Sequence, residues 1–133
     1  PVDQSKAPTL DSAKLERVLW PKDSVAYVAL DLETSGGKKH RNRVISLASM
    51  ASSAAGEQQQ GAPFSELIAI TSAVAPEATK IHKLTSESLK AAKGDFSVVG
   101  RAWLDWLTPH ISGASTVVLV AHNGFACDFR LLA

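Results

Sequence analysis

Two acidic side chains stand at the end of a strongly apolar stretch of the sequence. Asp31 and Glu33 lie at the end of a predicted strand, Ser24–Leu32, whose nearly continuous apolar residues indicate a central position with burial on both faces. Residues i and i+2 of a strand share a face, so the two carboxylates point together. Such a pair is costly unless a proton or a cation compensates it. Because Mg²⁺ prefers carboxylate oxygens, the pair indicates a metal site; the alternative is a solvated strand end with unrelated acids.

A second polar group follows another apolar run, near the C-terminal end of the sequence. His122 and Asn123 come directly after a predicted buried strand, Thr116–Ala121, and Asp128 opens a helix. If this strand lies parallel to the first, its end lies beside the first carboxylate pair, because open sheets bind ligands at the carboxyl ends of parallel strands. Asp128 would then be a third carboxylate at the same place. The alternatives are a helix-start acid for Asp128 and simple turn formation for His122 and Asn123.

The remaining sequence supplies the elements that would position these side chains. Three strands joined by short links predict an antiparallel meander, and a helix followed by an apolar fourth strand predicts a crossover to a parallel partner. Thr85 or Ser86 is a candidate N-cap for a short helix, whereas Thr85 and Ser88 do not match the capping-box pattern. The predicted elements are a helix at Asp11–Trp20, strands at Ser24–Leu32, Val44–Ala51, Phe64–Thr71 and Thr116–Ala121, an exposed loop at Ala54–Pro63, a helix at Phe96–Leu107 that stops before Pro109, and the opening of a helix at Asp128–Ala133.

Length and composition are those of one globular domain with a modest core. The 133 residues are 45% hydrophobic, and 14 basic against 13 acidic side chains leave a formal net charge of +1. Bulk charge therefore argues neither for nor against a nucleic-acid partner. The single cysteine, Cys127, excludes an intrachain disulfide and a multi-cysteine zinc site, and it favours an intracellular over a secreted location. No apolar run approaches the roughly 20 residues that span a membrane, so no membrane partner is expected.

Three segments match, in order, the motifs of a known enzyme superfamily. Residues 31–36, Asp-Leu-Glu-Thr-Ser-Gly, resemble its first motif, Asp-x-Glu-Thr-Thr-Gly. Residues 121–124, Ala-His-Asn-Gly, resemble its second motif together with Asp128. Between them, residues 76–85 resemble a Pro-x-Ala-x-x-x-His-Gly-Ile-Thr segment, with Lys83 in place of the glycine. Three motifs in the correct order are far more specific than any one of them.

Over Tyr27–Ala133 this pattern resembles the DEDD superfamily of 3′–5′ exonucleases, and the spacing of the second motif is similar to its DEDDh type, the three-prime repair exonuclease-like branch. The resemblance implies an α/β fold: a ribonuclease H-like mixed sheet, with three antiparallel strands and then a parallel strand, flanked by helices and C-terminally incomplete. Residues 1–23 would be an N-terminal lead-in with a short helix, and residues 24–133 a partial exonuclease domain.

The resemblance also implies an activity and a set of site residues. The activity is metal-dependent hydrolysis of phosphodiester bonds from a single-stranded or frayed 3′ end of DNA or RNA. Two Mg²⁺ or Mn²⁺ ions would activate water and stabilise the leaving oxygen. The implied catalytic and metal-binding residues are Asp31, Glu33 and Asp128. The implied substrate-binding residues are Thr34, Ile81, His82 and Asn123. For His82, a packed loop histidine is an equal alternative.

Other side chains have both a functional and a structural interpretation. The basic segment Lys38–Arg43 could contact a phosphate backbone, but an exposed turn that keeps the protein soluble is the preferred interpretation. Trp103 and Trp106 could stack on bases. Their helical spacing favours core packing instead.

The third motif of the superfamily, which would supply a general-base histidine or tyrosine and a fourth aspartate, is absent. No histidine of the sequence is followed by an aspartate five positions on, and all of them precede Asp128: they are His40, His82, His110 and His122. Loss of a general base typically costs a factor of about 10²–10⁴. We therefore expect little or no activity from this chain alone, and a missing C-terminal segment or a second chain to complete the domain. The alternative is a non-catalytic nucleic-acid-binding or protein-interaction module of the same fold.

Overall fold

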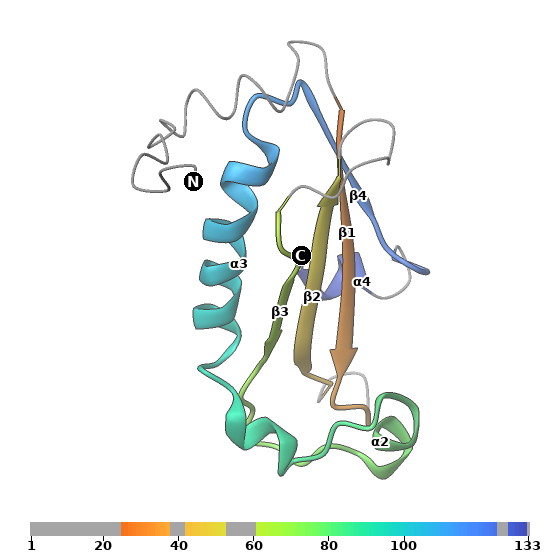
Figure 1. Cartoon of the computed structure of the whole chain (residues 1–133). Helices are drawn as coiled ribbons and strands as arrows, with labels where there is room; N and C mark the ends of the chain where they lie inside the picture. The colour runs from red at the N-terminus through yellow and green to blue at the C-terminus, as the bar shows by residue number, and fades with distance from the viewer. Residues whose placement is uncertain (1–24, 38–41, 53–60, 125–127, 133) are drawn as a thin grey trace, which may run out of the picture.

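The computed structural model describes residues 25–37, 42–52, 61–124 and 128–132, and its centre is a mixed sheet of strand order β3-β2-β1-β4 (Figure 1). β1 pairs antiparallel with β2 and parallel with β4, and β2 pairs antiparallel with β3, so the predicted arrangement of strands is confirmed. The elements are β1 (Val25–Thr34), β2 (Val44–Ser52), β3 (Phe64–Leu67), α2 (Pro76–His82), the 3₁₀ helix η3 (Ser88–Ala91), α3 (Phe96–Ile111), β4 (Thr116–Val120) and α4 (Asp128–Leu132). Three predicted features lie outside the described residues: the helix Asp11–Trp20, residues 38–41 of the basic segment and residues 54–60 of the loop.

One face of the sheet carries the main hydrophobic core. Val28, Leu30 and Leu32 of β1 alternate onto this face and pack against α3 and α4. The helix α3 buries Val99, Trp103 and Leu107, which stand four positions apart and so form one apolar stripe. Core packing of both tryptophans is confirmed, since Trp103 is buried and Trp106 packs against the same cluster. A second, smaller cluster lies around Ile45, Val74 and Leu89, with Ala78 of α2 packed against it.

The prediction that β1 is buried on both faces is wrong. β1 is central, but burial alternates strictly along its middle: Leu30 and Leu32 are buried, whereas Ala29 and Asp31 are exposed. The reason is that α3 and α4 cover one face of β1, and no described helix covers the opposite face at Ala29. A continuous apolar run implies two-sided burial only where a second layer exists.

The predicted burial of the fourth strand is also wrong. β4 lies at the edge of the sheet, and its apolar side chains are 41% exposed at Val117, 43% at Leu119 and 47% at Val120. Among the residues that the structure describes, no strand pairs with its outer edge. An apolar sequence therefore identified the strand without identifying its surroundings.

Several element boundaries also differ from the predictions. β3 ends at Leu67 because the chain then leaves the sheet, with Ala69 N–H bonded to the Gly94 carbonyl. α3 continues past Pro109, whose ring removes one N–H donor without stopping the last turn. Thr85 and Ser88 exchange side-chain-to-backbone hydrogen bonds at 3.1 and 3.2 Å in the turn before η3. The N-cap residue of η3 is Glu87, which makes no side-chain cap, so the prediction of Thr85 or Ser86 as the N-cap is wrong. No helix in the described part of the chain is long and apolar enough to cross a membrane.

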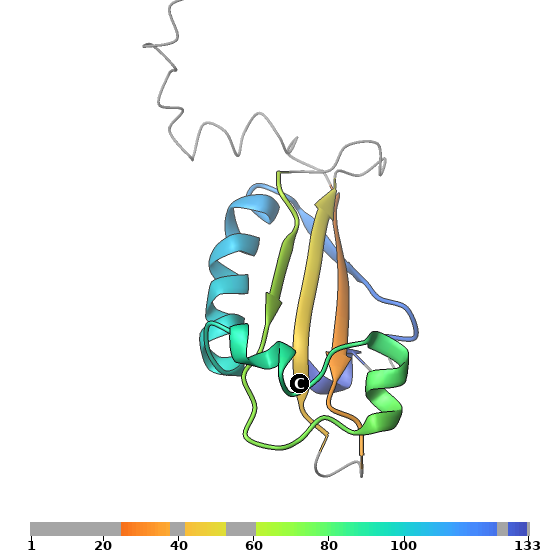
Figure 2. The same cartoon turned by 60° about the horizontal axis from the view of Figure 1, so that its bottom comes forward.

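The turn after β1 lies against α2, at the end of the sheet (Figure 2). Ser35 N–H donates to the Arg43 carbonyl at 2.8 Å, and the Ser35 carbonyl accepts from Ala75 N–H at 2.8 Å. Gly36 has φ +69°, and a Cβ placed on it would lie 2.8 Å from the Cβ of Ala78. Both the left-handed backbone and the close approach of α2 therefore require glycine.

Gly36→Ala should destabilise the fold by about 2–4 kcal/mol, because the variant adds a left-handed backbone cost and a clash with α2. Urea denaturation measures the free energy of unfolding. Gly37→Ala is the matched control, since its φ is +92° but an added Cβ meets nothing within 4 Å. Only the backbone cost of about 1–2 kcal/mol applies there. Equal losses in the two variants would contradict a close contact between the turn and α2.

Lys83 caps the C-terminal end of α2 with φ 66° and ψ 1°, the left-handed conformation in which helices commonly place glycine. In the superfamily segment that residues 76–85 resemble, this position is glycine. We expect Lys83→Gly to raise the free energy of unfolding by about 1 kcal/mol, through relief of the left-handed strain. Lys83→Ala removes the same charge but keeps a Cβ, so it should give no gain. A gain of the same size in both variants would assign the effect to charge instead of backbone strain.

Candidate active site

The second half of β1 has one edge that β4 does not cover. β4 pairs with β1 only as far as Ala29, opposite Val120, whereas β2 follows the other edge of β1 to its end. Beyond Ala29, the first residue of α4 takes up the open edge: Leu32 N–H donates to Asp128 Oδ1 at 3.1 Å. Asp128 is only 6% exposed. This bond satisfies a buried donor and holds a carboxylate beside the amide that lies between the two acids of β1.

Asp31 and Glu33 lie on the face of β1 opposite the buried Leu30 and Leu32, with Asp31 exposed and Glu33 half-buried. Immediately after Glu33 the pairing with β2 shifts, so that Ile45 has no partner on β1. This irregularity is a β-bulge, a feature that bends a strand and redirects its side chains. The carboxylate pair therefore lies on the last regularly paired residues of β1, directly before the bulge.

The charges near Glu33 show which groups share its surroundings. Burial raises the pKa of Glu33 above its ordinary value, and the neighbouring carboxylates of Asp31 and Asp128 raise it further, whereas a protonated His82 would lower it. The structure thus brings together three predicted site carboxylates and one predicted substrate-binding side chain. Like charges so placed destabilise one another unless a cation or a proton intervenes.

The donor set fits a hard divalent cation in chemical type. Carboxylate oxygens are the ligands that Mg²⁺ and Mn²⁺ favour. The Leu32 hydrogen bond occupies one oxygen of Asp128, and a carboxylate can accept at its second oxygen. Within the described ranges, no three His, Cys, Asp or Glu side chains form a ready-made metal cage. Burial and the neighbouring carboxylates both raise the pKa of Glu33, and a bound cation would favour its charged form against both effects.

His82 joins α2 to the end of β1. Its Nε2 lies 3.1 Å from the Thr34 carbonyl, and its Nδ1 accepts from Leu84 N–H at 3.0 Å. Thr34 is half-buried, and its carbonyl is engaged by this contact. Ile81, the residue before His82, is 81% exposed, the largest value among the exposed large hydrophobic residues that the structure describes. Thr34, Ile81 and His82 are therefore gathered at the end of β1 that carries Glu33.

Asn123 lies in the turn after β4 with φ 54°, a left-handed conformation that asparagine tolerates better than most residues. Both Asn123 and His122 are exposed. The structure records no contact of Asn123 with the carboxylates, so the turn-forming interpretation accounts for its conformation.

Sequence interpretation missed two residues that shape this end of the sheet. Ser35 is buried, and its Oγ accepts from Arg43 N–H at 3.0 Å. Asn42 Oδ1 accepts from Gly36 N–H at 2.9 Å. No periodic pattern marks either residue, because contacts across a turn leave no repeat in the sequence.

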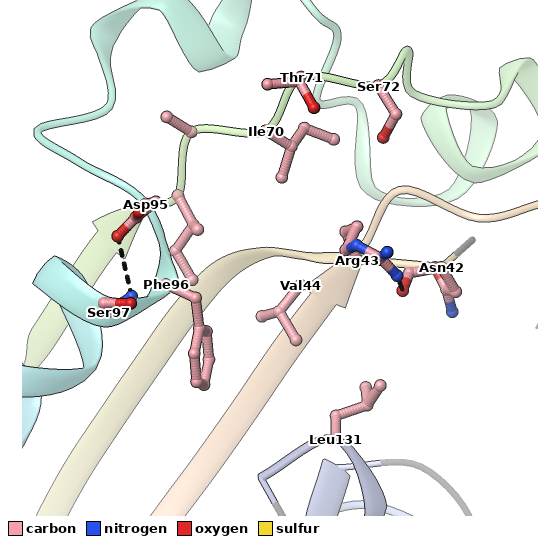
Figure 3. Close-up of a pocket in the computed structure, with 12 residues that line it drawn as sticks. Asn42, Arg43, Val44, Ile70, Thr71, Ser72, Asp95, Phe96, Ser97 and Leu131 are labelled. Carbon is pink, nitrogen blue, oxygen red and sulfur yellow. Dashed lines mark hydrogen bonds between the residues drawn. The ribbon is translucent and has the colours of Figure 1, made fainter. Parts of the chain in front are cut away.

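A pocket of about 590 Å³ is lined by the start of β2, the segment after β3 and the start of α3 (Figure 3). Its lining includes the apolar side chains of Val44, Ile70, Phe96 and Leu131, and also Asp95, which serves as the N-cap of α3. None of the predicted catalytic residues lines it. The clustered carboxylates carry the chemistry, so we take the end of β1 as the candidate site.

Comparison with known proteins agrees with this fold. A sequence model of the exonuclease family (RNase T) matches residues 28–132. No curated protein matches the chain. Exonuclease I of E. coli in complex with a dT13 oligonucleotide is similar in structure, with a TM-score of 0.67 at 15% identity over 80% of this chain and 22% of that chain. Cell-death related nuclease 4 (CRN-4) gives 0.62 at 17% identity over 72% of this chain and 34% of that chain.

These structural likenesses establish the ribonuclease H-like exonuclease fold that the motifs implied. The chain spans about a quarter of exonuclease I and a third of CRN-4. The family match includes the carboxylates of β1 and of α4 and extends over most of the sequence. The chain therefore belongs to the RNase T family of exonucleases, within the DEDD superfamily.

Proposed function

We propose that this chain provides the front part of a metal-dependent exonuclease domain that removes nucleotides from the 3′ end of a nucleic acid. The observation that carries the proposal is the hydrogen bond from Leu32 N–H to Asp128 Oδ1, which joins the acid of α4 to the acid-bearing segment of β1. Family membership supports nuclease chemistry in general. A neighbour of the same fold that binds a dT13 oligonucleotide supports a nucleic-acid substrate.

In this proposal Asp31, Glu33 and Asp128 hold two Mg²⁺ or Mn²⁺ ions. When bound, such ions supply Lewis acidity and lower the pKa of bound water, which serves in-line attack on phosphorus. The protein contributes the negative charge that retains the ions and the fixed backbone that orients it. Thr34 and the exposed Ile81 lie where a terminal nucleotide would rest against the end of β1. Asn123 would approach the scissile phosphate from the turn after β4.

No histidine in the given sequence is followed by an aspartate five positions later. We therefore propose that the chain binds metal and a 3′ end, and that its turnover is weak unless another segment or chain supplies a proton acceptor. The competing interpretation, a binding module without catalysis, predicts oligonucleotide binding that does not depend on the carboxylates.

Millimolar Mn²⁺ should raise the melting temperature of the protein, because a ligand that binds only the native state stabilises it. Asp128→Asn keeps an oxygen that accepts from Leu32 N–H but removes the charge. It should fold normally and lose most of the Mn²⁺ shift. Asp128→Ala leaves the buried Leu32 amide without an acceptor, which costs about 1–3 kcal/mol even without metal. Differential scanning fluorimetry measures both effects.

The same proteins tested on a 5′-labelled single strand in Mn²⁺ would report direction, since attack from the 3′ end gives a ladder of shortened labelled products. An unchanged Mn²⁺ shift in Asp128→Asn and Asp31→Ala would overturn the proposed site. Release of a labelled mononucleotide as the first product would overturn the proposed direction.

Glu33 should make the metal-free protein lose stability as pH rises. Its pKa is raised in the folded state, so its contribution is fully present below the unfolded pKa, near 4.5, and is lost as pH rises through the folded pKa. Glu33→Gln stays neutral throughout and should be more stable than wild type at neutral pH, with the difference narrowing in mild acid. Urea denaturation across a pH series in EDTA measures this. Asp105→Asn, an exposed change of equal charge on α3, is the control: the same pH-dependent difference in both variants would assign the effect to net charge instead of to the site.

A further inference from the structure

We propose that His82 is a positioning residue: in its neutral Nε2–H form it ties the C-terminal end of α2 to the end of β1, beside Glu33. This role differs from direct contact with a nucleotide, and its value for catalysis rests on the proposed function. The inference comes from three observations, namely the weakness of α2 as a helix, its anchor at the N-terminal end and the geometry of the His82 ring.

Burial of its own residues holds the helix α2 only weakly, through the partly buried Ala78 that packs against the cluster around Ile45. It contains seven residues, none of them buried, and its N-cap residue, Ala75, makes no side-chain cap. Helices this short are unstable in water unless other contacts fix them. Its position beside the site must therefore come from contacts near its two ends.

The N-terminal end is fixed by the turn after β1. Ala75 N–H donates to the Ser35 carbonyl, and Ala78 lies so near Gly36 that no Cβ would fit between them. These contacts hold the first turn of α2. They leave the last turn, which carries Ile81, in need of a second anchor.

The His82 ring supplies that second anchor, and its bonds determine its tautomer. Leu84 N–H donates to Nδ1, so Nδ1 must carry a lone pair and no proton. A neutral imidazole then has its proton on Nε2, which donates to the Thr34 carbonyl at 3.1 Å. Both ring nitrogens are thus committed to backbone groups. Neither ring nitrogen is left to hydrogen-bond a nucleotide, which favours the packed-histidine interpretation of the two that the sequence left open.

The anchor has a consequence for the site. Thr34 directly follows Glu33, so the bond to its carbonyl fixes the strand end at the carboxylate. The same bond fixes the last turn of α2 at the end of β1, and this turn carries Ile81, whose side chain is 81% exposed. Thr79 Oγ1 closes the turn by donating to the Leu84 carbonyl at 2.9 Å. Without His82, this wall of the site would fray with the last turn of α2.

Three substitutions separate positioning from contact with substrate. His82→Gln can place an amide N–H where Nε2 donates to Thr34, and His82→Asn can place a carbonyl where Nδ1 accepts from Leu84. His82→Phe keeps a ring for stacking but has no nitrogen. In metal-free protein we expect amide hydrogen exchange over residues 79–84 to speed up on the order of tenfold in the Phe variant, with the β1 and β2 amides unchanged. The Gln variant should stay within about threefold of wild type and the Asn variant between the two.

Oligonucleotide binding in Mn²⁺ should follow the same order, with Gln nearer to wild type than Phe. Retained binding in the Phe variant with loss in the Gln variant would overturn the proposal and restore a stacking role. If every variant fails to fold, ¹⁵N correlation spectra of the wild-type imidazole still decide, since an Nδ1-protonated ring would overturn the tautomer. The exchange and tautomer measurements need no metal, so an absent Mn²⁺ shift would defeat the proposed function and leave this anchor to be judged separately.

Discussion

Beyond Ala29, β1 keeps a strand partner on one side only, and a backbone N–H on the open side must find another acceptor or stay unsatisfied. The carboxylate of Asp128 is that acceptor for Leu32. One constraint thus serves both the fold and the site. Because β4 ends early, the Leu32 N–H has no strand partner, and the carboxylate of Asp128 at the start of α4 accepts its hydrogen bond. The position of the third carboxylate follows from backbone hydrogen bonding and does not depend on a metal for its explanation.

The same arrangement concentrates negative charge where the sheet has little else to balance it. Burial and the neighbouring acids raise the pKa of Glu33, and His82 would lower this pKa only with its ring protonated. A fold selected for stability alone would not place like charges together. Strain of this kind is typical of sites whose ligand restores the balance, and it is the physical reason for treating the end of β1 as functional.

Sequence reasoning was strongest where a short period governs structure. Alternation predicted that Asp31 and Glu33 share a face, and the parallel pairing of the first and fourth strands predicted that Asp128 would come near them. It failed where the answer depends on neighbours. The apolar sequence of β4 does not determine which elements cover the strand. The presence of Pro109 does not determine where α3 ends, because the helix continues to Ile111. The hydrogen bond from Leu84 N–H to His82 depends on the left-handed conformation of Lys83, which no sequence pattern predicts.

At the bulge beside Glu33, two consecutive residues of β2 pack into two different hydrophobic clusters. Val44 packs into the cluster under α3, and the unpaired Ile45 packs into the cluster near α2. Loss of that one extra residue would put β2 out of phase with its partner, since a slip of one position exchanges the two faces of a strand. Insertions and deletions at this point are therefore expected to be tolerated far less than substitutions, which keep the phase and change only the fit.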